Sequence, residues 1–183
     1  MIAGGLLSRL AAKLDAAGIP YMITGSFAST YHGTTRTTHD IDVVIDTDRT
    51  ALERLVRSFP DDEYYVDLDA ALDAFARRSQ FNVIDLETGW KADLIVRKDR
   101  EFSRGELARR EPAEILGARV FVATAEDTIV SKLEWAKIGE SERQLRDVAG
   151  ILDVRRGRLD LEYVERWVRE LGLEEVWSRA RSG

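Results

Sequence analysis

The chain has 183 residues, of which 44% are hydrophobic and 33% charged, a balance typical of an ordinary folded globular protein. It contains no cysteine, which excludes disulfides, thiolate nucleophiles and cysteine-ligated zinc, and fits a reducing, cytoplasmic location. The formal net charge of −6 argues against a protein that coats nucleic acid, because such binding needs a concentrated basic surface.

The N-terminal segment is predicted to be an amphipathic helix. The leucines between residues 6 and 14 recur at helical spacing, and Gly18 and Pro20 act as stop signals. Arg9 and Lys13 interrupt the apolar run, so the segment is neither a signal peptide nor a membrane span, and no contact with a membrane is expected.

A strand, a short helix and a second strand are expected next. Tyr21 to Ile23 is a short apolar run, and Phe27 to His32 suits one or two helical turns. After a threonine-rich stretch, Ile41 to Ile45 is β-branched and apolar, as expected of a central strand that is buried on both faces.

The middle of the chain alternates between the two kinds of element. Residues 97–114 are polar without clear periodicity and predict no regular element. The expected elements are a helix capped by Asp48 or Thr50 and ended by Pro60, a helix over 68–75, strands over 81–86 and 92–96 joined by a turn at 87–89, and a strand over 119–122.

From Ala125 to the end the apolar pattern is helical throughout. The sequence therefore predicts an α+β core over residues 1–123, followed by a helical region over 124–183 that packs on it. Trp135, Trp167 and Trp177 are expected to face the interior of this helical region.

Three aspartates form the first candidate site. Asp40 and Asp42 open the buried strand two residues apart, so both carboxylates point to the same side. Two neighbouring acids repel, and a divalent cation such as magnesium would relieve this repulsion. Asp93 lies in a later apolar strand and would complete a two-metal site, in which it also accepts a proton. Asp85 competes for this third position, but its neighbours indicate the exposed end of its strand.

Gly25 and Ser26 form a candidate phosphate site, because a strand passes into a helix there and leaves backbone amides exposed. Arg36 precedes the acidic pair and either contacts a phosphate, neutralises Asp40 or lies in solvent. For His32, a partly buried ring satisfied by the backbone is preferred over a role in the site.

Taken in order, Gly25-Ser26, Asp40-Ile41-Asp42 and Lys91-Ala92-Asp93 resemble the signature of the DNA polymerase β-like nucleotidyltransferase superfamily. The segment GSFASTYHGTTRTTHDIDVVI is similar to small bacterial nucleotidyltransferase-like proteins related to the abortive-infection and type IV toxin-antitoxin group. The gap between Ser26 and Asp40 is longer than in aminoglycoside-type transferases, which disfavours an antibiotic-modifying enzyme.

The resemblance extends into SKLEWAKIGESERQLRDVAGIL, where Lys132, Arg143 and Asp147 match basic and acidic positions of the group. From the residues alone, Lys132 is instead the rim of an apolar helix face, and Arg143 with Asp147 is a helical ion pair.

The resemblance implies a nucleotidyltransferase fold, a short mixed sheet with flanking helices. It also implies two magnesium ions, and transfer of a nucleoside monophosphate from a nucleoside triphosphate to a hydroxyl of a transfer RNA or protein. It assigns metal binding to Asp40, Asp42 and Asp93, and phosphate contacts to Ser26 and Lys132. A cognate toxin or antitoxin would be a partner. Two alternatives stay open, a binding module without catalysis and a magnesium-dependent hydrolase.

Overall fold

The computed structural model describes residues 2–34, 38 and 40–182. Over these residues, seven strands form one mixed sheet in the order β3-β4-β5-β2-β1-β7-β6, which confirms the α+β fold class. The strands are β1 (Tyr21–Ile23), β2 (Asp40–Ile45), β3 (Tyr64–Tyr65), β4 (Gln80–Asp85), β5 (Lys91–Val96), β6 (Glu111–Ile115) and β7 (Ala118–Val122). Strand β2 is central, as expected, and pairs parallel with β5 and antiparallel with β1.

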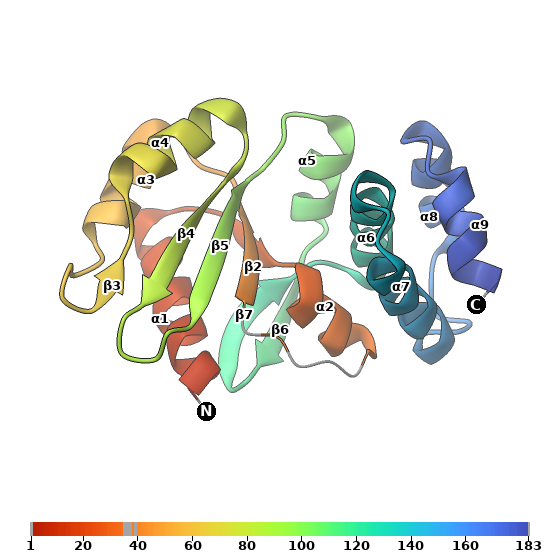
Figure 1. Cartoon of the computed structure of the whole chain (residues 1–183), viewed down its shortest axis with the longest axis horizontal. Helices are drawn as coiled ribbons and strands as arrows, with labels where there is room; N and C mark the ends of the chain where they lie inside the picture. Colours follow the sequence, from red (N-terminus) through yellow and green to blue (C-terminus); the bar gives the residue numbers. More distant parts are fainter. Residues whose placement is uncertain (1, 35–37, 39, 183) are drawn as a thin grey trace.

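The helices are α1 (Ile2–Ala17), α2 (Gly25–His32), α3 (Arg49–Arg57), α4 (Leu68–Arg77), α5 (Glu101–Ala108), α6 (Ala125–Gly139), α7 (Glu142–Val154), α8 (Leu161–Glu170) and α9 (Glu174–Ser182). Figure 1 shows α6 beside the sheet and α7, α8 and α9 beyond it, at the end of the molecule away from β3. None of the helices in the described ranges is both long and apolar enough to cross a membrane.

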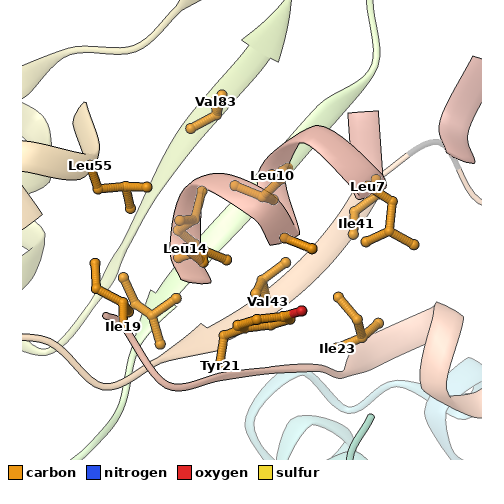
Figure 2. Packing of buried hydrophobic residues seen from close by; sticks show 14 of the residues in the cluster. Leu7, Leu10, Leu14, Ile19, Tyr21, Ile23, Ile41, Val43, Leu55 and Val83 are labelled. Atoms are coloured by element: carbon orange, nitrogen blue, oxygen red, sulfur yellow. The ribbon is translucent and has the colours of Figure 1, made fainter. Parts of the chain in front are cut away.

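The main core lies between α1 and one face of the sheet. Leu10 and Leu14 of α1 are at most 1% exposed and belong to one buried cluster with Ile41 and Val43 of β2. Figure 2 shows these side chains gathered between the helix and the strands. Full burial of such a side chain stabilises the fold by roughly 1.5–3 kcal/mol. The face of β2 that packs on α1 therefore holds the strand in place, and the opposite face of β2 is left for the site.

A second core holds the C-terminal helices together around Phe102 of α5. Trp167 and Trp177 are buried in it, as predicted. The prediction for Trp135 was wrong, because its side chain is 53% exposed and lines a pocket instead. Helix α6 therefore has one face in the second core and another toward the site.

The polar stretch from residue 97 to 114 contains α5 and β6, so the prediction of no regular element was wrong there. Helix α5 buries Phe102 and Leu107 but has too few apolar residues for a visible helical period. Strand β6 lies at the edge of the sheet, where Pro112 is tolerated because an edge strand can spare one backbone donor.

Candidate active site

The pairing of β2 with β5 brings the three predicted carboxylates together. The two strands run parallel with Asp42 opposite Asp93 and Asp40 opposite Lys91. Neighbouring strands lie about 4.8 Å apart and residues in register point to the same face, so these acids share the face opposite α1. The structure thus places Asp40, Asp42 and Asp93 in one pocket, as the sequence predicted.

Burial makes the Asp42 carboxylate costly to keep charged. Burial raises the pKa of Asp42 to about 6, and the charges of Asp93 and Asp40 contribute in the same direction. Asp93 is 7% exposed, and its Oδ1 atom is buried without a hydrogen-bond partner among the described residues. An unpartnered buried carboxylate oxygen is unfavourable, so the pocket favours a ligand that supplies positive charge.

Gly25 joins the start of α2 to the acidic strand. Its φ angle is +61°, and a Cβ atom built there would lie 2.0 Å from Asp42 Oδ2, so only glycine fits. The backbone N–H of Ser26 donates to the Asp42 carboxylate, and the Thr24 N–H donates to the Asp42 carbonyl over 2.9 Å. The predicted phosphate site is therefore hydrogen-bonded to Asp42, one of the three predicted metal ligands.

Lys91 is a member of the site that sequence reasoning did not assign. Its Nζ lies 3.1 Å from Asp93 Oδ2 and 3.6 Å from Asp40 Oδ1. Burial alone would lower the pKa of Lys91, but hydrogen bonds and charges from Asp93 and Asp40 outweigh it, so its pKa is raised. The signal was present in the sequence, because residues 91 and 93 point to the same side of a strand.

Helices α6 and α7 close the other side of the pocket, which has a volume of about 280 Å³. The sheet and α2 contribute the carboxylates, Gly25 and Ser26. The remaining described lining residues are Thr24, Thr38, Gln80, Ile95, Thr128, Ser131, Lys132, Trp135, Arg143 and Gln144. The sequence assigned only Lys132 and Arg143 among these residues, because it does not show which strand and helix faces turn toward the pocket.

Lys132 is buried inside this wall and is not the solvent-reaching rim that the residues alone indicated. It is 3% exposed and donates to Gln144 Oε1 at 2.8 Å and to Asp147 Oδ2 at 2.7 Å. Its positive charge acts on Asp42 and favours the ionised carboxylate. The expected ion pair between Arg143 and Asp147 is replaced by this contact, and within the described part of the chain Arg143 has no ion-pair partner.

Asp85 and His32 lie outside the pocket. Asp85 is 2% exposed and ion-paired with Arg9, so the expectation that it lies at an exposed strand end was wrong. His32 Nε2 hydrogen-bonds the Ala123 carbonyl at 2.7 Å, as preferred from the sequence. The remaining candidate, Arg36, lies outside the described residues.

The oxygen atoms of the three aspartates suit magnesium, although the side chains do not converge on one point. No three acidic or histidine side chains within the described ranges are close enough together to hold a metal. Asp40, Asp42 and Asp93 nevertheless offer only oxygen donors, which magnesium prefers, and Asp93 Oδ1 lacks any other partner. The residues therefore fit the ion chemically.

A mixed sheet that carries three aspartates on adjacent strands beside a Gly-Ser helix start is the arrangement that the resemblance to nucleotidyltransferases implies. The model of the aminoglycoside-2''-adenylyltransferase family matches residues 6–126, more than half of the chain, and the chain belongs to that family. No curated protein sequence matches it.

Solved structures share the fold. The solution structure of the antibiotic-resistance factor ANT(2'')-Ia is 19% identical, with 97% of this chain and 98% of that one covered and a TM-score of 0.59. An antigenic nucleotidyltransferase-like protein from Paracoccidioides brasiliensis is 19% identical over 94% and 90% of the two chains, with a TM-score of 0.53. The lincosamide antibiotic adenylyltransferase LnuA, solved with lincomycin, is 11% identical over 81% and 95%, with a TM-score of 0.53.

The family match overturns one expectation from the sequence. The length of the gap between Ser26 and Asp40 predicts a difference from aminoglycoside-type transferases, yet the matched region includes that gap. Lengthening a surface loop costs little free energy, so its length is a poor guide to family. The similarity to the toxin-antitoxin group stays a prediction.

Proposed function

We propose that this protein is a magnesium-dependent nucleotidyltransferase that moves a nucleoside monophosphate from a nucleoside triphosphate to a hydroxyl group. One observation carries the proposal. The in-register pair Asp42 and Asp93, with an unpartnered oxygen, faces the Gly25-Ser26 helix start in one pocket. A metal–triphosphate complex supplies both the cation and the anion that this arrangement needs.

Asp40, Asp42 and Asp93 would hold the magnesium, with two ions as the expected number. When bound, the metal neutralises charge on the phosphates and polarises the phosphorus that is attacked. Asp93 also accepts the proton of the attacking hydroxyl. A bond forms between the acceptor oxygen and the α-phosphorus, the bond to the β-phosphate oxygen breaks, and pyrophosphate leaves.

The phosphates would lie between α2 and the helical half. Gly25 and Ser26 line the pocket on one side, and Lys132 and Arg143 supply positive charge from the other. Lys132 is held by two hydrogen bonds, so it supplies a charge at a defined place. Arg143 is exposed and would close on the triphosphate when it arrives.

The acceptor hydroxyl has two candidate sources. The family name, and the names of ANT(2'')-Ia and LnuA, concern transfer to antibiotics, which makes an antibiotic hydroxyl the first acceptor to test. A transfer RNA or a protein hydroxyl, with a toxin-antitoxin partner, is the second. A different function, nucleotide binding without transfer, is favoured by the ion pairs through which Lys91 already engages Asp40 and Asp93.

The first experiment measures binding. Thermal unfolding and intrinsic tryptophan fluorescence are followed with each nucleoside triphosphate, with and without magnesium, since Trp135, one of the four tryptophans, is exposed in the pocket. A ligand at 100 times its dissociation constant stabilises the folded state by about 2.7 kcal/mol. We expect magnesium-dependent stabilisation of the wild type and of Asp153→Asn, a matched exposed control, but not of Asp42→Asn.

The second experiment measures transfer. Triphosphate labelled at the α-phosphate is incubated with antibiotics, transfer RNA and total protein, and the label is followed into each acceptor. Label that enters an acceptor with the wild type but not with Asp93→Asn supports transfer. Binding of triphosphate without label in any acceptor would favour the binding module, and the absence of binding would overturn both functions.

A further inference from the structure

Lys91 lies where a cation would be held by Asp40 and Asp93. We propose that its ammonium group is the resident counter-ion of these carboxylates and is displaced when the divalent metal binds. This inference rests on the proposed metal-dependent function. It assigns a positioning role to a residue that has no place in the transfer chemistry described above.

The backbone places Lys91 there for a simple reason. It is the register partner of Asp40 on the neighbouring strand and precedes Asp93 by two residues on the same face. Its Nζ therefore reaches both acids, at 3.6 Å from Asp40 Oδ1 and 3.1 Å from Asp93 Oδ2. A lysine ammonium is a compact charge on a flexible stem, so it can stand in for an ion and then move away.

The contacts of Lys91 are those of a removable group. Its side chain is 33% exposed, so solvent is within reach, and it leaves Asp93 Oδ1 without a partner. Lys132, which lines the pocket, offers the contrast. Its side chain is 4% exposed and is held by Asp147 and Gln144 at 2.7 and 2.8 Å. Lys132 is thus held inside the protein, whereas Lys91 is partly exposed and can move into solvent.

The presence of Lys91 also explains why no three of the described acids are close enough together to hold a metal ion. While the ammonium lies between Asp40 and Asp93, those carboxylates are oriented toward nitrogen and not toward a common ion. A metal that enters must therefore compete with a charge already present. Lys91 would lower the affinity of the empty site for divalent cations and keep the acids paired without metal.

The test measures binding of manganese alone, by calorimetry and by the electron paramagnetic resonance of free Mn²⁺, without nucleotide. Lys91→Met is expected to bind the ion roughly tenfold more tightly than the wild type, as loss of competition worth about 1.4 kcal/mol would give. Lys91→Arg keeps a cation and stays at or below the wild-type affinity. Lys98→Met removes an exposed lysine outside the pocket and serves as the matched control.

A second measurement uses the wild type and does not depend on the folding of a variant. Lysines are acylated under mild conditions with and without magnesium, and the extent of modification at each site is read by mass spectrometry. Acylation of Lys91 should rise at least severalfold with magnesium, whereas that of Lys98 should not change.

The outcomes separate this inference from the proposed function. The counter-ion role is overturned, and the proposed metal site is kept, if the wild type binds manganese but Lys91→Met binds it no more tightly. The same holds if the wild type binds manganese but magnesium does not change the acylation of Lys91. If neither protein binds the ion, even with triphosphate present, both are overturned.

Discussion

Two buried acids in this molecule have opposite surroundings. Asp127, at the start of α6, is 0% exposed, and its carboxylate accepts hydrogen bonds from Thr124 Oγ1 at 2.6 Å, Tyr163 Oη at 2.6 Å and Arg109 Nε at 3.2 Å. Asp93 is nearly as buried, yet one of its oxygens has no partner among the described residues. The number of hydrogen-bond partners, and not burial itself, separates Asp127 from Asp93, the proposed metal ligand.

The difference follows from where each acid lies. Asp127 is in the first turn of α6, where backbone donors and the Thr124 cap favour negative charge. Asp93 lies on a strand whose backbone groups are used in the sheet, with Asp42 directly opposite. A strand therefore leaves a carboxylate for an outside partner, which suits a metal site.

Asp93→Asn should produce the largest effect on activity. It removes a proposed metal ligand and the proposed base, so the transfer rate should fall about a thousandfold or more. The free energy of unfolding should stay the same or rise slightly, because repulsion with Asp42 is relieved. Steady-state transfer assays and urea unfolding check the two parts. A strongly destabilised Asp93→Asn would mean that this acid is structural after all.

Asp127→Ala should produce the largest effect on stability. It leaves Arg109 and the hydroxyls of Thr124 and Tyr163 without their shared partner, which should cost about 3 kcal/mol of unfolding free energy. Urea unfolding followed by circular dichroism measures the loss. Asp127→Asn keeps part of the hydrogen bonding and should lose less. A cost below about 1 kcal/mol would contradict the contrast with Asp93.

Glu106 should make stability depend on pH. Burial, helped by the charge of Asp127, raises its pKa from 4.5 to about 7, so the folded state holds this proton more tightly than the unfolded chain does. The resulting stabilisation is complete below about pH 4.5, declines as the pH rises toward 7 and is then lost. The difference should be about 3 kcal/mol, since each pKa unit between 4.5 and about 7 corresponds to about 1.4 kcal/mol.

Glu106→Gln tests this directly. The amide cannot titrate but still accepts from Ser131 Oγ, so this contribution to the pH dependence should vanish between pH 5 and 7. Thermal unfolding of both proteins across this range measures it. An unchanged slope in the variant would assign the pH dependence to another group.

Arg143→Ala should have the smallest effect on folding and a selective effect on binding. The side chain is exposed and has no ion pair within the described chain, so unfolding should change by less than about 0.5 kcal/mol. Triphosphate affinity should fall several-fold, because one positive charge at the pocket is lost. Arg146→Ala, on the same helix but outside the pocket, is the control in a fluorescence titration. Equal affinities for the two variants would remove Arg143 from the site.

The sequence predicted the parts of the site that depend on local spacing. Asp40 and Asp42 share a face because strand residues alternate, and Gly25 begins a helix because the chain turns there. The same alternation explains why Asp85 is outside the pocket. It lies on the same side of β4 as the core residues Phe81 and Val83, and so points away from Asp93. The proposed roles of these residues stay predictions.

The rest depends on contacts between distant segments. Lys132 meets Asp147 and Gln144 only because α6 and α7 pack side by side, and Trp135 is exposed because of how that pair meets the sheet. Helical periodicity identifies an apolar face but not the neighbour that covers it. The division of the chain at residue 123 into a core and a helical region likewise stays a prediction.

Helix α2 connects the carboxylates of the sheet with the end of helix α7. At one end Gly25 and Ser26 touch Asp42, and at the other, about 12 Å away, His32 receives a hydrogen bond from Arg155 at the end of α7. A tilt of the C-terminal helices would therefore be transmitted to Gly25 and Ser26 beside Asp42. Substitution of Arg155 is therefore expected to change the proposed nucleotide affinity from outside the pocket.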